Sequence, residues 1–497
     1  MKICLLNDSF PPVIDGVVNV VQNYAKYLQS EYGAEITVGC PRYPDADYSS
    51  YPYEVIAYRS YDTTAMTSGY RTGDPFSGKD VSRLAAKTPD LIHAHSPASA
   101  LVVARLLREE TDAPIVYTYH TKYDIDIRRA VRLETIAREG IHLMVSNIEA
   151  CDEVWVVSRG AGENLKSLGF QGEYRVMNNG VDFAKGRVSD KEVEEATAGY
   201  DLPAGVPMFL FVGRMMTYKG LPMILDALKL LADSGQDFRM VFVGKGADQE
   251  MLMKKAQELR LMGDEPGRGK CIFTGPVYDR NVLRAWNTRA DLFLFPSTFD
   301  TNGLVVREAA ACGLASVLIR DSCAAEGITD GRNGFIIDET PEAMASLLQR
   351  VCADIGQAHR AGEHAMEEIY LSWETCVAQA HERYVSILEA KKAGKLPQKK
   401  KVPADYLIQA AARGMAGQEK LRQRRKEMMD DLKAGAVGMM ENIQDDIHEI
   451  QENTQENIQD AGEKAEQLAD RMKDGLKKGT ERMVQSVKET LHLDQTE

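Results

Sequence analysis

The stretch "MFLFVGRMMTYKGLPMILDALKLL", residues 208–231, decides the fold. It begins with a short apolar run that ends in a glycine, which is typical of a buried strand. It ends with apolar residues spaced three and four apart, as in a helix that buries one face. Between the two lies a short loop that carries Arg214 and Lys219. The stretch therefore predicts a strand, a loop and a helix in the order used by α/β proteins.

The same unit recurs along residues 1–390, in two series. Strands are predicted at residues 2–7, 35–40, 90–96, 114–121 and 153–158, and then at 208–213, 238–244, 271–275, 291–297, 315–320 and 334–338. Strands that alternate with helices form parallel sheets with crossover helices, so we expect two doubly wound Rossmann-like domains. Open parallel sheets bind ligands at the carboxyl ends of their strands, and two such domains face each other across a cleft.

The expected boundaries follow from this alternation. We place a first domain at residues 1–190 and a second at 191–372, with a helix at 373–390 that packs back on the first. Neither domain has a GxGxxG sequence after a strand, and the chain has no GxxxxGK[ST] sequence. A dehydrogenase or a P-loop enzyme is therefore disfavoured.

Composition narrows the class of protein further. The 497 residues include eight scattered cysteines with no CxxC pair, which indicates thiols in a reducing cytosol. The apolar run at the N-terminus is too short for a signal peptide, and no run approaches the roughly 18 apolar residues of a membrane span. The net charge of −14 is carried by the first 390 residues, so no nucleic-acid partner is expected.

The loop of residues 213–220 is the first candidate for chemistry. Arg214 and Lys219 lie between a strand and a helix N-terminus, a setting that suits a diphosphate. A solvated loop with two incidental bases is the alternative, and chemistry alone does not separate the two.

The second candidate is "FDTNGLVVREAAACG", residues 299–313. The N–H groups of Gly303 and Leu304 at the helix start can receive a phosphate oxygen. Asp300 and Glu308, with seven residues between them, can hold sugar hydroxyls because a carboxylate accepts two hydrogen bonds at once. The alternative is a helix cap at Asp300 and a surface acid at Glu308.

Taken together, five blocks resemble a family 4 glycosyltransferase of the GT-B fold over residues 1–390. The blocks are "PPVIDGVVNVV" (11–21), "NNGVDF" (178–183), "GRMMTYKG" (213–220), "FDTNGLVVREAAACG" (299–313) and "SWETCVAQAHERYVSIL" (372–388). The resemblance implies a retaining hexosyltransferase that uses a nucleotide-sugar. Its α/β fold would be two Rossmann-like domains facing a cleft, here followed by a helical C-terminal extension.

The resemblance also implies roles for particular residues. Arg214 and Lys219 match the pair that holds the diphosphate, and Gly16 matches a glycine that lets the backbone approach it. Asp300 and Glu308 match the E-x7-E motif, whose first acid orients the donor sugar and whose second holds the ribose. Asp300 departs from the family glutamate, as do Asn302 from a common aromatic residue and Ala315 from a common proline, and these departures bear on the identity of the donor.

His120, in "YTYHTKYD", matches the histidine that reaches the reacting sugar. In family members the acceptor attacks the donor sugar from the front face, and the leaving diphosphate helps to deprotonate the acceptor. The resemblance therefore implies no protein nucleophile, no metal and no cofactor. His93 and His95 lie two apart on a predicted strand and so face one side, which makes a metal site with His120 conceivable. Strand alternation produces such pairs routinely, and a metal is not expected.

Within the family, the chain most resembles the enzymes that glucosylate diacylglycerol in bacterial membranes. The resemblance rests on the loop "PPVIDGVVNVV" (11–21) and on Tyr119, His120, Thr121 and Tyr123, together with the bases Lys122, Arg128, Arg129 and Arg132. We therefore expect UDP-glucose as donor, 1,2-diacylglycerol as acceptor, and a cytoplasmic protein held peripherally on the inner face of the membrane. The alternatives are another acceptor, namely phosphoinositol, a soluble sugar or a polysaccharide precursor, and a non-catalytic GT-B scaffold.

The resemblance stops at residue 390. Residues 391–426 hold twelve lysines and arginines against two acids, which predicts a basic linker and an amphipathic helix suited to anionic lipid. Residues 427–497 hold eighteen acids against eight bases, with an eleven-residue repeat over 441–495. That repeat keeps an apolar stripe nearly straight along a helix, so we expect this tail to self-associate or to bind a protein partner.

Overall fold

The computed structural model describes residues 1–64, 69–130, 133–265, 267–397, 405, 408–414 and 424–429. It divides into two compact units, Met1–Ala416 and Gly417–Glu497. The first unit contains both parallel sheets. The repeat predicted at 441–495 lies outside the described residues, as does most of the tail after residue 414.

The first sheet has seven parallel strands in the order β3-β2-β1-β6-β7-β8-β9. Its strands are β1 (Lys2–Leu6), β2 (Glu35–Pro41), β3 (Glu54–Tyr58), β6 (Leu91–Ala94), β7 (Ile115–Tyr119), β8 (Glu153–Val156) and β9 (Arg175–Val176). Its helices are α1 (Gly16–Tyr32), α2 (Gly78–Ala85), α3 (Ser99–Thr111), α4 (Tyr123–Ala130), α5 (Glu134–Glu149) and α6 (Arg159–Ser167). A short antiparallel pair, β4 (Ser60–Tyr61) and β5 (Thr72–Gly73), lies in the connection from β3 to α2.

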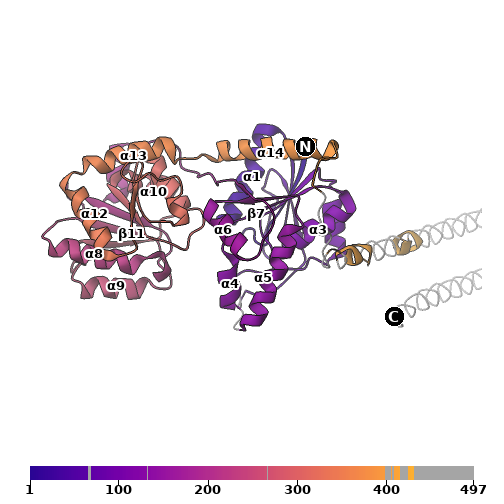
Figure 1. Cartoon of the computed structure of the whole chain (residues 1–497), viewed down its shortest axis with the longest axis horizontal. Helices are drawn as coiled ribbons and strands as arrows, with labels where there is room; N and C mark the ends of the chain where they lie inside the picture. The colour runs from indigo at the N-terminus through magenta and orange to yellow at the C-terminus, as the bar shows by residue number, and fades with distance from the viewer. Residues whose placement is uncertain are drawn as a thin grey trace, which may run out of the picture. The chain divides into compact units, whose positions relative to one another are not determined.

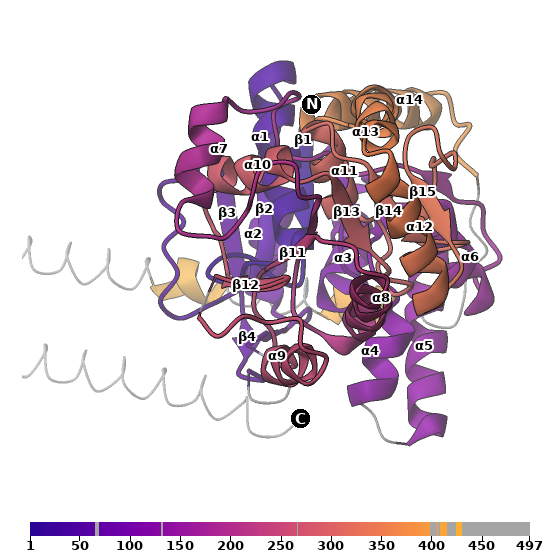
Figure 2. The same cartoon turned by 90° about the vertical axis from the view of Figure 1, so that its left-hand side faces the viewer.

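The second sheet has six parallel strands in the order β12-β11-β10-β13-β14-β15. Its strands are β10 (Met208–Val212), β11 (Arg239–Val243), β12 (Cys271–Gly275), β13 (Leu292–Phe295), β14 (Ser316–Ile319) and β15 (Phe335–Ile337). The helices of this part are α7 (Asp190–Thr197), α8 (Leu221–Asp233), α9 (Gln249–Glu258), α10 (Arg280–Arg289), α11 (Leu304–Ala311), α12 (Pro341–Ala353) and α13 (Gly356–Glu368). Two short 3-10 turns, η1 (Thr217–Lys219) and η2 (Cys323–Ala325), follow β10 and β14. Figure 2 shows α8 and α12 side by side, and the two helices contact each other.

The apolar runs form these strands because helices cover both faces of each sheet. Phe209, Leu210 and Phe211 of β10 are fully buried, including residues that point to opposite faces. All eleven predicted strands are present, and β3 and β9 extend the first sheet beyond the prediction. The predicted α/β class with two doubly wound domains is confirmed.

Helix α14 (Trp373–Lys392) packs against the domain of the first sheet. Its residues Trp373, Val377 and Tyr384 belong to the core that contains β1, β2 and α1, and Figure 1 shows α14 running alongside α1. The Arg383 guanidinium binds both oxygens of Glu153 at the start of β8. α14 therefore ties the chain that follows the second sheet to the first.

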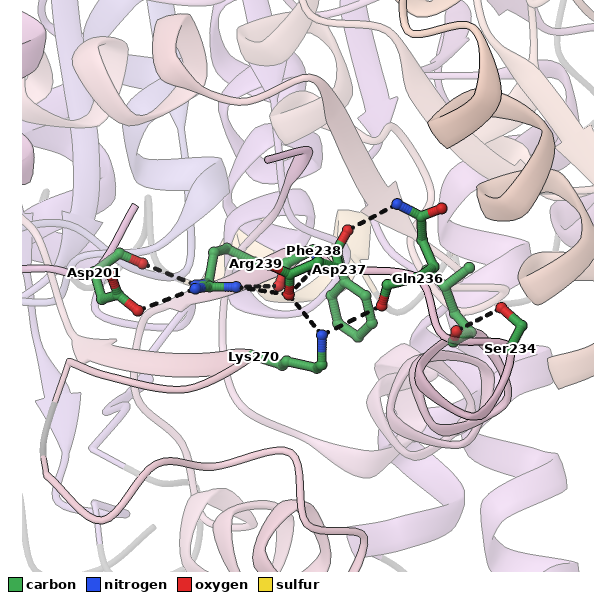
Figure 3. Close-up of polar contacts among 8 residues, drawn as sticks. Asp201, Ser234, Gln236, Asp237, Phe238, Arg239 and Lys270 are labelled. Carbon is green, nitrogen blue, oxygen red and sulfur yellow. Dashed lines mark hydrogen bonds and ion pairs between the residues drawn. The ribbon is translucent and has the colours of Figure 1, made fainter. Parts of the chain in front are cut away.

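A cluster of charged residues lies at the amino ends of β11 and β12 in the second sheet (Figure 3). Arg239, the first residue of β11, donates to carboxylate oxygens of Asp201 and Asp237, each at 3.0 Å. Lys270, which directly precedes β12, donates to the same Asp237 at 2.6 Å. These ion pairs lie at the amino ends of the strands, so they stabilise the sheet without occupying the carboxyl ends, where ligands bind.

The chain after α14 is anchored to the first domain. Arg105 of α3 is 1% exposed and binds the Asp405 carboxylate at 2.5 Å. Its other terminal nitrogen donates to the side-chain oxygen of Asn147 in α5. Ile408 and Ala412 are buried in the same apolar core. Part of the predicted basic segment 391–426 is therefore included in the packing of the first domain.

None of the helices within the described residues is both long and apolar enough to cross a membrane.

The Asp405 anchor gives a stability prediction. Replacing Asp405 with alanine leaves a buried cation without its counter-charge, and we expect the free energy of unfolding to fall by about 3 kcal/mol. Urea denaturation followed by circular dichroism measures the change. The matched control is Glu195→Gln, which breaks an exposed ion pair with Lys191 and should cost about 0.5 kcal/mol or less. An equal, small effect of both substitutions would contradict the anchoring role.

Candidate functional site

The strand order places the two predicted loops next to each other. In the second sheet the chain runs outward from β10 on one side and from β13 on the other, so β10 and β13 are neighbours at the point where the order reverses. The loop after β10 carries Arg214 and Lys219, and the loop after β13 carries Asp300. Ligands of doubly wound sheets bind at such a switch point.

An ion pair joins the two loops. The Lys219 ammonium lies 2.8 Å from both oxygens of Asp300, and the Ser297 hydroxyl donates to one of them at 2.6 Å. The Lys219 side chain is 9% exposed and that of Asp300 is 27% exposed. The carboxylate thus keeps lone pairs for a further donor such as a sugar hydroxyl, because each oxygen accepts more than one hydrogen bond.

Gly220 allows this close approach of the two loops. It separates η1 from α8 and has a φ of 77°, a left-handed conformation that favours glycine. A Cβ at this position would lie 2.5 Å from the carbonyl oxygen of Pro296, at the start of the Asp300 loop. A larger residue would therefore push Lys219 away from Asp300.

The start of α11 offers backbone N–H groups at the same edge. Gly303 caps the helix in a left-handed conformation, with a φ of 57°, and no side chain among the described residues makes a cap hydrogen bond there. Leu304 is the first helical residue. The helix dipole and these unpaired donors favour an anion such as a phosphate at this position.

Glu308 lies one turn further along α11 and has a partner that the sequence did not point to. Its carboxylate accepts a hydrogen bond from Arg280 at 2.6 Å, and its side chain is 15% exposed. Burial raises the pKa of Glu308, and the nearby Arg280 guanidinium opposes that shift. Arg280 also lies over the ring of Phe183, 4.4 Å from its centroid, so the pair is held in place from both sides.

Arg214 and Gly16 belong to segments that follow strands of different sheets, Arg214 after β10 and Gly16 after β1, at the start of α1. Arg214 is exposed and lies close enough to Tyr70 to lower the pKa of its phenol, although burial raises that pKa by more. Tyr70 donates a hydrogen bond to Asp15, which caps α1 just before Gly16. A Cβ on Gly16 would have no described atom from outside its own helical turn within 4 Å. The fold itself therefore does not require glycine there, which fits a position kept clear for a ligand.

His120 follows β7 and is held against the Asp300 loop. The Thr301 hydroxyl donates to the His120 carbonyl oxygen at 2.5 Å, and the Lys122 ammonium donates to the Thr298 carbonyl oxygen at 3.3 Å. The His120 side chain is 5% exposed, and burial lowers the pKa of its imidazole to about 3. The ring is therefore neutral at physiological pH.

The histidines do not form a metal site within the described residues, where no three metal-binding side chains come together. His93 has both ring nitrogens in hydrogen bonds, to Tyr384 at 2.5 Å and to Thr118 at 2.7 Å. His95 contacts His120 instead.

A third contact between the two sheets' loops was not predicted either. Glu326, after η2, accepts hydrogen bonds from the backbone N–H groups of Arg159 and Gly160 at 2.7 and 2.5 Å. These N–H groups open α6, so the carboxylate fills the anion site of that helix. Only the position of Glu326 shortly after a strand end could have drawn attention to it. The predicted residues thus lie at or near loops of the two sheets that face each other. Four residues that the sequence did not predict contact these loops or the predicted residues, namely Arg280, Ser297, Thr301 and Glu326.

Two family models match the chain in succession. The model described as "Glycosyltransferase Family 4" matches residues 14–185, and the model described as "Glycosyl transferases group 1" matches residues 192–368. The first match contains Gly16 and His120, and the second contains the Lys219 and Asp300 loops.

Curated relatives match along most of the chain. The sulfoquinovosyl transferase SQD2 of Arabidopsis thaliana is 27% identical over 71% of this chain and 67% of its own length. The alpha-monoglucosyldiacylglycerol synthase of Acholeplasma laidlawii is 23% identical over 70% of this chain and 87% of its own length. A D-inositol 3-phosphate glycosyltransferase of Xylanimonas cellulosilytica is 26% identical over 61% and 73%.

Solved structures share the fold. HepE from Anabaena, solved with UDP-glucose, superposes with a TM-score of 0.59 at 19% identity, over 78% of this chain and all of that one. Sucrose-phosphate synthase from Thermosynechococcus elongatus gives a TM-score of 0.61 at 19% identity, over 78% and 99%. These likenesses support the GT-B arrangement of the two domains.

The Arg280–Glu308 pair predicts how donor binding depends on pH. If Glu308 holds the ribose, as the resemblance implies, it would do so as the carboxylate, which is present above its pKa and is lost as pH falls through it. Replacing Arg280 with methionine removes the charge that opposes the raised pKa, so the acid limb of binding should move to higher pH. Titration calorimetry with UDP-glucose between pH 4.5 and 8 measures this limb.

The control for this experiment is Arg289→Met in the last turn of the same helix, whose guanidinium donates to the Leu202 carbonyl oxygen and not to Glu308. The control variant should keep the wild-type limb. An unchanged limb in Arg280→Met would show that Glu308 does not hold the donor as a carboxylate.

Proposed function

Because the chain belongs to the family 4 glycosyltransferases of the GT-B fold, we propose that it transfers glucose from UDP-glucose to 1,2-diacylglycerol with retention of the anomeric configuration. The facing loops of the Lys219–Asp300 pair and His120 support this proposal. Lys219 and Arg214 provide the positive charge for the diphosphate, and the start of α11 provides N–H donors for it.

The proposed reaction balances without a protein nucleophile. The acceptor oxygen forms a bond to the anomeric carbon, and the bond from that carbon to the diphosphate oxygen breaks. The acceptor proton passes to the leaving diphosphate, whose negative charge the Lys219 ammonium and the α11 amides stabilise. Positioning and charge stabilisation then supply the rate, and the proposal needs neither a metal nor a cofactor.

The choice of donor rests on the acid pair and on a structural relative. Asp300 keeps free lone pairs beside Lys219, which suits a sugar hydroxyl close to the diphosphate, and Glu308 suits the ribose. HepE, which shares the fold, was solved with UDP-glucose. The shorter Asp300 reaches Lys219 and Ser297 without a second methylene, so the departure from glutamate does not remove its partners.

One observation carries the lipid acceptor, namely an exposed apolar stripe formed by α5 and its N-cap residue Leu133. Leu133, Ile136 and Leu143 are 64%, 56% and 58% exposed. Together with Gly140 they lie three, four and three residues apart, which places them on one face of the helix. Figure 1 shows α4 and α5 side by side at the lower end of the first domain. Such a stripe suits shallow insertion into a membrane surface, and we place it on the inner face.

The bases expected to contact anionic lipid contribute less than the sequence indicated. Lys122 donates to Thr298, and Arg128 pairs with Glu134. Arg132 lies outside the described residues, and so does the side chain of Arg129. The apolar stripe and the basic residues 391–426 are therefore the stronger support for a peripheral protein.

A phosphoinositol acceptor is the alternative, favoured by the similarity to D-inositol 3-phosphate glycosyltransferases. It predicts transfer to inositol phosphate in the absence of any vesicle. The diacylglycerol proposal predicts transfer only when a lipid surface is present.

Turnover tests the proposal directly. The full chain is incubated with UDP-glucose and vesicles of phosphatidylglycerol and diacylglycerol, and the product is identified by mass and by anomeric configuration. We expect α-linked glucosyl diacylglycerol from the wild type and a loss of at least a hundredfold in Lys219→Ala, with the circular dichroism spectrum unchanged. Glucosylated inositol phosphate would replace the diacylglycerol proposal, and full activity of Lys219→Ala would refute the diphosphate role.

The α5 stripe predicts that the protein binds to lipid vesicles through this helix. Replacing Leu133, Ile136 and Leu143 with serine should lower partition onto the same vesicles at least tenfold, equivalent to about 1.4 kcal/mol of lost apolar burial. Co-sedimentation measures the bound fraction. The control replaces Leu230 and Met251, which are 42% and 44% exposed on α8 and α9, with serine. If both variants bind like the wild type, α5 does not contact the membrane.

A further inference from the structure

Three histidines form a continuous buried stack behind the proposed site. The rings of His93 and His95 lie 3.9 Å apart between centroids, and the rings of His95 and His120 lie 5.3 Å apart and nearly parallel. His93 and His95 are fully buried, and His120 is 5% exposed. Burial lowers the pKa of all three imidazoles, so all three rings are neutral at physiological pH.

A neutral imidazole has one N–H donor and one bare acceptor nitrogen. Which nitrogen of His120 carries the proton therefore decides what the ring offers a ligand. His120 Nε2 lies 3.1 Å from His95 Nδ1, within hydrogen-bonding distance. Since Nε2 is used inside the protein, Nδ1 is the nitrogen of His120 left to meet a ligand.

The other nitrogen of His95 settles the direction of this hydrogen bond. His95 Nε2 is buried and has no partner among the described residues. If His120 donated the bond, His95 would carry its proton on that Nε2, and a buried N–H would have no acceptor. If His95 donates, only a lone pair is left unsatisfied. Unpaired buried N–H groups are the rarer and costlier of the two.

We propose that His95 is a positioning residue that donates its Nδ1–H to His120 Nε2 and so holds His120 as the Nδ1–H tautomer, with a donor and not an acceptor facing the cleft. The role of that donor rests on the proposed function, in which His120 contacts the sugar or the acceptor. A neutral N–H can then hold a sugar hydroxyl oxygen or the developing charge on the leaving oxygen.

His93 supports the stack and does not share this role. Both ring nitrogens of His93 are hydrogen-bonded, to Tyr384 and Thr118, so His93 does not fix the tautomer of His95 or His120 through a hydrogen bond. Tyr384 lies on α14 and stacks on Trp155, which fixes the far end of the stack. Of the two histidines on β6 and directly after it, His95 is thus the one whose hydrogen bond leads to His120.

Three substitutions of His95 separate a hydrogen-bonding role from a packing role. Asparagine places an N–H donor where Nδ1 stands, glutamine places its amide one bond further out, where Nε2 stands, and phenylalanine keeps the ring without any donor. We expect His95→Gln and His95→Phe to lose kcat about 10- to 100-fold with little change in KM for UDP-glucose. His95→Asn should retain most of kcat. Equal losses in all three variants would assign His95 to packing alone and overturn the proposal.

A second measurement stands apart from activity. Selective labelling of the full-length protein with 15N-histidine, with His120→Asn used to assign the signal, reports directly which His120 nitrogen carries the proton. We expect a proton on Nδ1 in the wild type and in His95→Asn, and an exchanging mixture in His95→Phe. A proton on Nε2 in the wild type would overturn the proposal even if every variant folded poorly.

The two measurements also separate this proposal from the proposed function. If His120 carries its proton on Nδ1 but His120→Asn turns over normally, the tautomer assignment holds and the catalytic placement of His120 is wrong. If His120→Asn is inactive and the wild-type proton lies on Nε2, the function holds and the role of His95 is wrong.

Discussion

The ammonium of Lys219 on the two oxygens of Asp300 is the interaction on which the site depends. It links the loops after β10 and β13, and those loops meet because the sheet order reverses between these two strands. With the Lys219 side chain 9% exposed, its charge is poorly solvated and needs a counter-charge. A diphosphate bound at the start of α11, as proposed, would add negative charge beside the same ammonium. One cation can therefore hold the loops together and bind the donor.

The first domain is coupled to this pair through main-chain atoms. The carbonyl oxygen of His120 accepts from Thr301, next to Asp300, and the first N–H groups of α6 bind Glu326. Backbone groups at strand ends cannot move without moving their strands. These contacts thus hold the loops after β10 and β13 in place against the loop that carries His120. They can do so whatever side chains line the rest of the cleft. If the reactants bind between these loops as proposed, this arrangement would separate their positioning from the recognition of a particular acceptor.

Much of the fold could be predicted from the sequence, because its signals are local. Buried parallel strands are short apolar runs, and each of the eleven predicted runs is a strand. β3 was missed because only two of its five residues are buried, as on the edge of a sheet, and β9 because it has only two residues. The predicted site residues were found through motifs at strand ends, and the structure places them around facing loops. Their individual roles stay predictions.

Other features could not be predicted, because they depend on partners far along the chain. Arg280 is an ordinary base at a helix start until Glu308 is placed beside it, 28 residues later. Arg105 resembles a surface base in a helical pattern, yet it is buried against Asp405, 300 residues away. The spacing of His95 in the sequence indicates only a candidate metal ligand, whereas in the structure its Nδ1 faces His120. Local spacing carries no record of such pairs.

The central claim is that Lys219 holds the diphosphate while Asp300 holds the sugar, and calorimetry on both ligands tests it most directly. UDP and UDP-glucose are titrated into the wild type, Lys219→Met, Asp300→Asn and the double variant. Lys219→Met should weaken UDP about 10- to 100-fold, the range for a hydrogen bond to a charged group. Asp300→Asn should leave UDP binding undiminished and remove only the additional affinity due to glucose. Unchanged UDP binding in Lys219→Met, or an equal loss of UDP binding in Asp300→Asn, would contradict the account.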